Sequence, residues 1–144
     1  MPIEAHWEGR LDLSRVPGTD GTYRIWKPLT FWSAEQETGF QIQPHFQTDG
    51  ASVPRAFRWL AAPFAGKHAA AAVLHDALYY DGFLGKEASD LLFLEAMKCS
   101  GVSVWRRQAL YQAVKWFGWP AWREHRKKDS WTDRTATAIK LINP

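Results

Sequence analysis

Cysteine and long apolar runs are scarce in this chain, and their scarcity excludes several classes of protein. Cys99 is the one cysteine, so neither an intramolecular disulfide framework nor a cysteine zinc cage can form. The first residues include Glu4, Glu8 and Arg10, and no apolar run is as long as a signal peptide or a membrane span requires. We therefore expect no signal peptide and no transmembrane segment.

Net charge is also small. The formal charge is +3 at neutral pH, and much of it comes from one basic stretch at residues 123–128. Nucleic-acid-binding domains usually combine such charge with a recognisable motif, and none is found in this sequence. The composition therefore does not favour a nucleic-acid partner.

Hydrophobic and aromatic residues are plentiful. The chain has 144 residues, of which 46% are hydrophobic and 23% charged, as in folded domains with their own core. It also has more large rings than the interior of a small domain usually holds, so we expect several at a contact surface. These rings are the nine tryptophans, Trp7, Trp26, Trp32, Trp59, Trp105, Trp116, Trp119, Trp122 and Trp131.

The order of local patterns predicts one α+β domain over residues 1–144. N-terminal antiparallel strands are expected to precede a helical hairpin and a further C-terminal helix. We expect residues 1–50 to be rich in strands, residues 51–120 to form a helical core and residues 121–144 to form a basic tail. The tail beyond Trp122 is expected to be helical or irregular.

Individual elements follow from periodicity and from turn residues. β-Type alternation predicts strands at residues 22–26 and 40–43. Gly118 and Pro120 are typical stop signals for a helix that precedes them. Helical spacing between such signals predicts helices at residues 55–60, 66–80 and 86–99, and a fourth helix that has Ser103 as its N-cap and ends at Phe117.

The turn at Gly82 and Phe83 brings polar residues of two helices together. His75 and Asp90 are each about seven or eight positions from its midpoint, so they should face each other in an antiparallel pair. Tyr79 is one turn after His75 and should donate its hydroxyl to Asp90. A carboxylate on one ring nitrogen of His75 would leave the other nitrogen for a water or a ligand.

A polar loop follows the second predicted strand. It contains Thr48, Asp49 and Ser52, and Asp76 should point toward it because Asp76 is about a quarter turn from His75. We therefore expect a polar centre to which one loop and two helices contribute. Two simpler explanations remain open: the buried network could merely lock the helices together, and Asp49 and Ser52 could be turn and helix-cap residues.

Four segments in this order resemble the phage and prophage family known as domain of unknown function thirteen-fifty-three. The resemblance implies a phage context and no particular reaction. It implies synthesis in the host cytoplasm, with the virion as a second location, and other phage proteins as partners. The four segments are Phe46-Gln47-Thr48-Asp49-Gly50-Ala51-Ser52-Val53-Pro54, Leu74-His75-Asp76-Ala77-Leu78-Tyr79, Ser89-Asp90-Leu91-Leu92-Phe93-Leu94-Glu95-Ala96-Met97 and Tyr111-Gln112-Ala113-Val114-Lys115-Trp116-Phe117-Gly118.

The His75-Asp76-Ala77-Leu78-Tyr79 helix and Asp90 also resemble the catalytic helices of phospholipase A2. This resemblance implies that His75 is a general base oriented by Asp90, with Tyr79 beside them. It implies that Asp76 binds Ca²⁺ or another divalent metal and that the Asp49 loop supplies further oxygen ligands. The implied function is a metal-assisted hydrolase acting on a lipid or another cell-envelope substrate.

Two other functions remain open. The segment that ends at His75-Asp76 also resembles the metal motif of HD-type phosphohydrolases, for which His45 and Asp129 are the candidate further ligands. His68 is roughly 10 Å from His75 along the helix, too far to share an ion directly. The other alternative is a non-enzymatic phage structural or assembly component, such as a tail-associated protein, whose tryptophans and basic tail form an interface.

Overall fold

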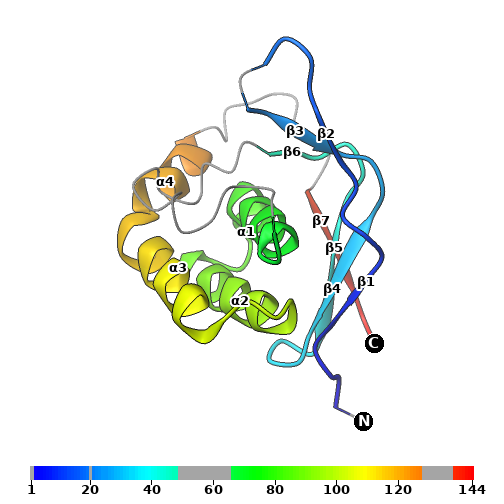
Figure 1. Cartoon of the computed structure of the whole chain (residues 1–144), viewed down its shortest axis with the longest axis vertical. Coiled ribbons are helices and arrows are strands. Elements are labelled where there is room, and N and C mark those ends of the chain that lie inside the picture. The colour runs from blue at the N-terminus through cyan, green and yellow to red at the C-terminus, as the bar shows by residue number, and fades with distance from the viewer. Residues whose placement is uncertain (1, 20, 49–65, 128–137) are drawn as a thin grey trace.

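Four helices and a β-layer make up the computed structural model in Figure 1, which describes residues 2–19, 21–48, 66–127 and 138–144. Helices α1 and α2 pack on the strands, while α3 packs on α2 and α4 packs on α1 (Figure 1). The predicted α+β class is confirmed, because strands come first and a helical hairpin and further helices follow. The helices are α1 (Ala69–Asp81), α2 (Lys86–Cys99), α3 (Val104–Phe117) and α4 (Trp119–Lys127).

Two antiparallel sheets form the β-layer. The larger has the order β1-β4-β5-β7, with strands β1 (His6–Glu8), β4 (Leu29–Ser33), β5 (Thr38–Ile42) and β7 (Ile139–Ile142). The smaller has the order β2-β3-β6, with strands β2 (Leu13–Arg15), β3 (Tyr23–Ile25) and β6 (Gln47–Thr48). β6 ends at Thr48, the first residue of the segment that was predicted to be a polar loop.

Two of these strands were predicted with small shifts. The segment 22–26 contains β3, and the segment 40–43 overlaps β5, which begins two residues earlier. The remaining strands have two to five residues each, too few for alternation to distinguish them from loops. Their register comes from pairing: Phe31 of β4 lies opposite Phe40 of β5, and both rings are buried.

The helical predictions agree well with the structure. α2 has the predicted bounds, α3 begins one residue after the predicted Ser103 cap, and α1 begins at Ala69 rather than at residue 66. Gly82 ends α1 in the left-handed conformation at φ 71°, and its N–H donates to the Leu78 carbonyl. The helix predicted at residues 55–60 is outside the described part of the chain.

α4 occupies part of the segment that was expected to be a basic tail. Gly118 ends α3, but a new helix begins at once because Pro120 is in its first turn, where a missing N–H costs little. Arg126 of α4 donates to the carbonyls of Tyr79 and Tyr80 at 2.6 and 3.0 Å. Its guanidinium thereby covers the carbonyl end of α1, where a positive charge is favoured.

The strand β7 was not predicted within the tail. Four residues, Ile-Lys-Leu-Ile, carry too little alternation to indicate a strand by themselves. Asp81 at the end of α1 accepts hydrogen bonds from the backbone N–H groups of Ala138 and Ile139, at 2.9 and 2.8 Å. β7 is therefore held at the sheet edge by β5 and by the end of the helical hairpin.

Small side chains of α1 belong to the hydrophobic core. They are Ala71, Ala72 and Ala77, and all three are buried. Glu95 of α2 fastens the hairpin turn after β4, accepting from the Ser33 hydroxyl and from the Ala34 N–H at 3.0 Å. Glu95, which belongs to one of the four family-like segments, is thus part of the scaffold.

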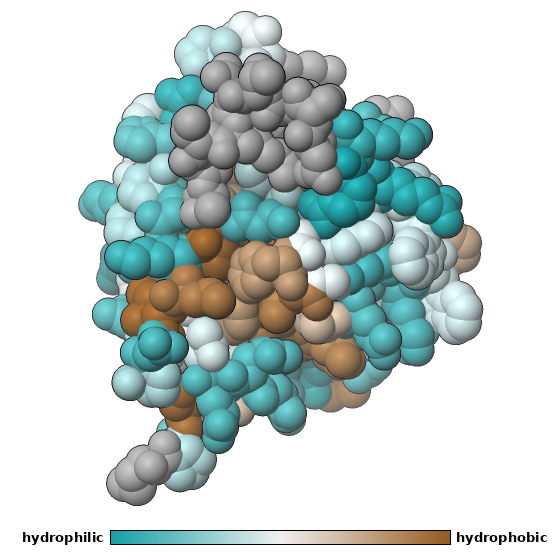
Figure 2. Space-filling model, turned by 180° about the vertical axis from the view of Figure 1, so that it is seen from behind, coloured by the Kyte–Doolittle hydropathy of each residue, from teal (hydrophilic) through white to brown (hydrophobic). Residues whose placement is uncertain are grey.

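Apolar side chains also reach the surface. Figure 2 shows them gathered in one area on the back of the molecule, bounded by hydrophilic residues. Phe83 in the turn of the helical hairpin is half exposed and stacks on Phe40, whose partner in the sheet register is Leu141. Among the helices that the structure describes, none combines the length and the apolar character needed to cross a membrane.

Candidate functional site

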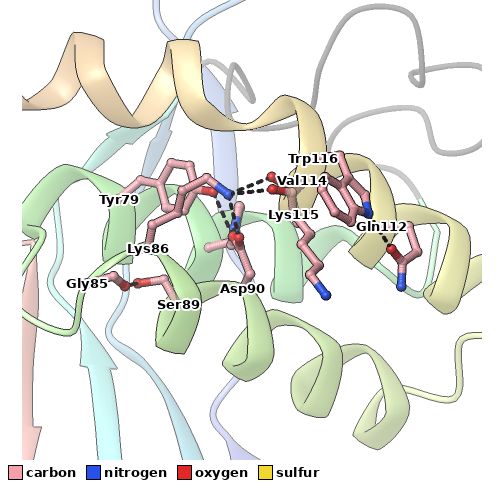
Figure 3. Close-up of polar contacts among 10 residues, drawn as sticks. Tyr79, Gly85, Lys86, Ser89, Asp90, Gln112, Val114, Lys115 and Trp116 are labelled. Atoms are coloured by element: carbon pink, nitrogen blue, oxygen red, sulfur yellow. Dashed lines mark hydrogen bonds and ion pairs between the residues drawn. The ribbon is translucent and has the colours of Figure 1, made fainter.

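Asp90 is the centre of a buried polar network between α1 and α2 (Figure 3). Its Oδ1 accepts from the Tyr79 hydroxyl at 2.6 Å and lies 2.8 Å from His75 Nε2. Its Oδ2 accepts from the Lys86 ammonium at 2.8 Å. The predicted contacts of His75 and Tyr79 with Asp90 are therefore confirmed.

The charge of Asp90 fixes the tautomer of His75. Burial alone would raise the pKa of Asp90, but the hydrogen bond and charge of His75 and the hydrogen bonds from Lys86 and Tyr79 outweigh it. The pKa of Asp90 therefore lies below its ordinary value, and the carboxylate is ionised. Since an ionised carboxylate only accepts, His75 Nε2 carries a proton and donates it, so the neutral form of the imidazole has its lone pair on Nδ1.

His75 Nδ1 is the atom of this network that could act on a ligand. The side chain is fully buried, between the rings of Tyr79 and Phe93. Within the described part of the chain, no protein group hydrogen-bonds to Nδ1. A buried acceptor left in this way usually holds an ordered water or is kept for function, since leaving it unsatisfied costs about 1–3 kcal/mol.

Lys86 is a member of the network that sequence analysis missed. Its ammonium uses all three donors, to Asp90 Oδ2, to the Val114 carbonyl at 2.8 Å and to the Lys115 carbonyl at 3.1 Å. Lys86 precedes Asp90 by four residues on α2, and this i,i+4 spacing is the signal that could have identified it. The half-exposed Trp119 ring covers the ammonium at 4.9 Å from its centroid.

The network continues into the ends of α3 and α1. Lys86 places a cation at the last carbonyls of α3, where the helix dipole favours it. A Cβ at Gly118 would lie 2.8 Å from the Tyr79 hydroxyl, closer than real Cβ atoms approach, so this position requires glycine.

Burial, the hydrogen bond to Asp90 and the nearby charges of Asp90 and Asp76 raise the pKa of Tyr79 well above its ordinary value. Tyr79 therefore remains a donor.

Acid is expected to weaken the fold through Asp90. Because the pKa of Asp90 is lower in the folded than in the unfolded chain, its ionised form contributes stability that is complete above the ordinary carboxyl pKa of about 4. This contribution is lost as the pH falls through the lower, folded-state pKa. Urea unfolding between pH 7 and pH 3 should show a steeper loss for the wild type than for Asp90→Asn, and equal slopes would contradict the assignment.

Thr48, the last residue of β6, contributes to the site. Its hydroxyl donates to Asp76 Oδ2, and both residues are buried, so Asp76 contacts the first residue of the predicted loop. Asp49 and Ser52, the other loop residues predicted for the site, are outside the described residues. What they contribute stays a prediction.

The described residues alone do not supply a metal site. Ca²⁺ takes six to eight oxygen ligands, whereas one carboxylate, Asp76, and one hydroxyl, Thr48, meet here. Within residues 2–19, 21–48, 66–127 and 138–144, no three His, Cys, Asp or Glu side chains gather closely enough to hold an ion. Of the ligands considered for an HD-type centre, His45 stacks edge-on against Trp26, and Asp129 is not among the residues described.

The side chains that meet at Asp90 lie in the part of the chain that matches a family model. The model of the family described as "Protein of unknown function (DUF1353)" matches residues 23–114, which contain His75, Tyr79, Lys86 and Asp90. The chain is also similar to the uncharacterized protein y4jT of Sinorhizobium fredii (strain NBRC 101917 / NGR234), with 36% identity over 80 residues. That match covers 53% of this chain and 23% of the relative, so the chain spans less than a quarter of y4jT. No solved structure matches the chain.

Proposed function

We propose that this chain, which belongs to the DUF1353 family, is a phage-encoded hydrolase in which His75 is the general base. The observation that carries the proposal is the difference in hydrogen bonding between the two ring nitrogens of His75. Nε2 is fixed by Asp90, and Nδ1 is buried with no protein partner in the described part of the chain. This arrangement fixes one tautomer of the neutral imidazole, with the lone pair on Nδ1, which is the form that takes a proton from a water.

The proposed reaction is hydrolysis of a carboxylic ester. His75 Nδ1 takes a proton from a water, and the oxygen of that water adds to the ester carbonyl carbon. The tetrahedral intermediate then expels the alcohol oxygen, which takes the proton back from Nδ1. Asp90 stabilises the imidazolium between these transfers and keeps the ring orientation fixed. Tyr79 is a positioning residue, since its hydroxyl holds Asp90 Oδ1.

Lys86 keeps Asp90 ionised in the proposed site. Its ammonium neutralises Asp90 on the side away from His75, so the carboxylate stays ionised in a buried site. The same ion pair means that loss of Asp90 would leave a buried cation unpaired. Substitution of Asp90 therefore changes stability as well as activity, and His75 is the better residue on which to test catalysis.

A divalent cation at Asp76 remains a prediction. The neighbouring Thr48 hydroxyl supplies a second oxygen, and Asp49 would supply another. At a free Ca²⁺ concentration 100 times the dissociation constant, binding should stabilise the fold by about 2.7 kcal/mol. Thermal unfolding in Ca²⁺ and Zn²⁺ titrations should show this shift for the wild type and lose it in Asp76→Asn. Asp12→Asn, at an exposed carboxylate, is the control. An equal shift in both variants would contradict the site.

The test of the proposed hydrolase is a substrate screen with matched proteins. Soluble esters, phospholipid vesicles and peptidoglycan should be incubated with wild type and with His75→Gln, with and without Ca²⁺. Product released by the wild type alone would support the proposal. No hydrolysis of any of these by the wild type would favour the alternative of a non-enzymatic phage component, in which the Asp90 network only joins helices.

A further inference from the structure

Exposed tryptophans and basic side chains occur together on α3 and α4. Trp105, Trp116 and Trp119 are 60%, 65% and 46% exposed, which is unusual for so large and apolar a side chain. Residues 104–127 contain six Lys and Arg residues and one acidic residue, Glu124. We call the three tryptophans with Arg106, Lys115 and Arg123 the α3–α4 face.

Each of these tryptophans lies beside a cation. The Arg106 guanidinium is 5.4 Å from the Trp105 ring centroid, Lys115 Nζ is 5.5 Å from that of Trp116, and Arg123 is 5.6 Å from that of Trp119. Figure 3 shows that the Lys115 side chain points away from Lys86 and Asp90, although its carbonyl receives Lys86. A partner can therefore contact Trp105, Trp116 and Lys115 without displacing the buried network, which the face meets at Trp119, over the Lys86 ammonium.

Position along the helix places the two tryptophans of α3 together. Trp105 and Trp116 are eleven residues apart, which is close to three full turns, so they project from the same side of α3. Gln112 lies between them on that side and accepts from the indole N–H of Trp116 at 2.8 Å. The opposite side of α3, with Leu110, Ala113 and Val114, is buried.

We infer that the α3–α4 face docks on a bilayer that contains anionic phospholipid. Indole rings settle at the headgroup level of a membrane, and Lys and Arg beside them meet lipid phosphates at the same depth. A single-stranded nucleic acid is less well matched, because it needs ring faces free for base stacking, whereas here basic groups lie over the rings. The inference does not depend on the proposed hydrolysis.

Vesicle sedimentation tests this surface. The full chain should bind vesicles of phosphatidylglycerol and phosphatidylcholine and should bind pure phosphatidylcholine at least about tenfold more weakly, as expected for cations near anionic lipid. Arg106→Glu with Arg123→Glu, and separately Trp105→Ser with Trp116→Ser, should each weaken binding to the mixed vesicles about tenfold or more. Lys27→Glu with Lys98→Glu makes the same change in net charge on residues outside α3 and α4 and should bind nearly as the wild type does.

Three results would overturn the inference. They are no binding to anionic vesicles, equal loss in the Lys27→Glu and Lys98→Glu control, or displacement from vesicles by an equal concentration of single-stranded oligonucleotide. Circular dichroism of each variant excludes unfolding as the cause of a loss. His75→Gln should bind vesicles as the wild type does, so failure of the membrane surface and failure of the hydrolase can be distinguished.

Discussion

His75→Gln is expected to lower the hydrolytic rate about 10²–10⁴-fold, the usual contribution of a general base, while the fold is kept. The glutamine amide can still donate to Asp90 Oδ1 from near the position of Nε2, so the buried carboxylate stays satisfied. What disappears is the lone pair of Nδ1. The measurement is the initial rate on whichever substrate the wild type hydrolyses, together with urea unfolding of both proteins.

His6→Gln is the matched control, because His6 is exposed on β1 and belongs to no buried network. It should retain the wild-type rate. If His75→Gln hydrolyses the substrate as fast as the wild type, His75 is not the base. If it unfolds in much less urea with no specific loss of rate per folded molecule, the imidazole is a structural element of the helix pair.

Lys86→Met is expected to lower the free energy of unfolding by about 3–5 kcal/mol, the usual cost of removing one partner of a buried ion pair. Methionine can fill the space under the Trp119 ring. It cannot neutralise Asp90, and it leaves the carbonyls of Val114 and Lys115 without this donor. Urea unfolding at neutral pH measures the loss.

Lys98→Met is the control for Lys86→Met, because Lys98 is an exposed lysine near the end of the same helix. Its substitution should change stability by less than about 0.5 kcal/mol. Combining Lys86→Met with Asp90→Asn removes both charges and should cost less than the sum of the two single changes. A loss in Lys86→Met no larger than in Lys98→Met would mean that Lys86 is not paired with Asp90 in solution.

The core of the network could be predicted because it depends on one short connection. Gly82 fixes the turn between α1 and α2, and the distance of each residue from that turn then determines which side chains lie level. His75, Tyr79 and Asp90 follow from this count. Lys86 does not follow from this count. Its ammonium donates to Asp90 and to two backbone carbonyls of α3, and the position of those carbonyls depends on how α3 packs on α2.

The elements that sequence patterns missed, as with β7, or predicted only as helical or irregular, as with α4, are those that depend on distant partners. β7 has four residues and pairs with β5. The Asp81 carboxylate also accepts a hydrogen bond from the Ala138 N–H just before β7, and these two residues are 57 positions apart in the sequence. α4 follows a glycine and contains a proline in its first turn, signals that on their own favour a stop. Its helix is supported by contacts with α1, including Arg126 on the Tyr79 and Tyr80 carbonyls.

Two helices of this fold have their carbonyl ends closed by a side chain of another helix. Arg126 of α4 closes α1, and Lys86 of α2 closes α3. A last turn normally frays alone, but here it can open only when the neighbouring helix also moves. Amide hydrogen exchange at the ends of α1 and α3 should therefore be nearly as slow as in their middles, and the four helices should open as one cooperative unit.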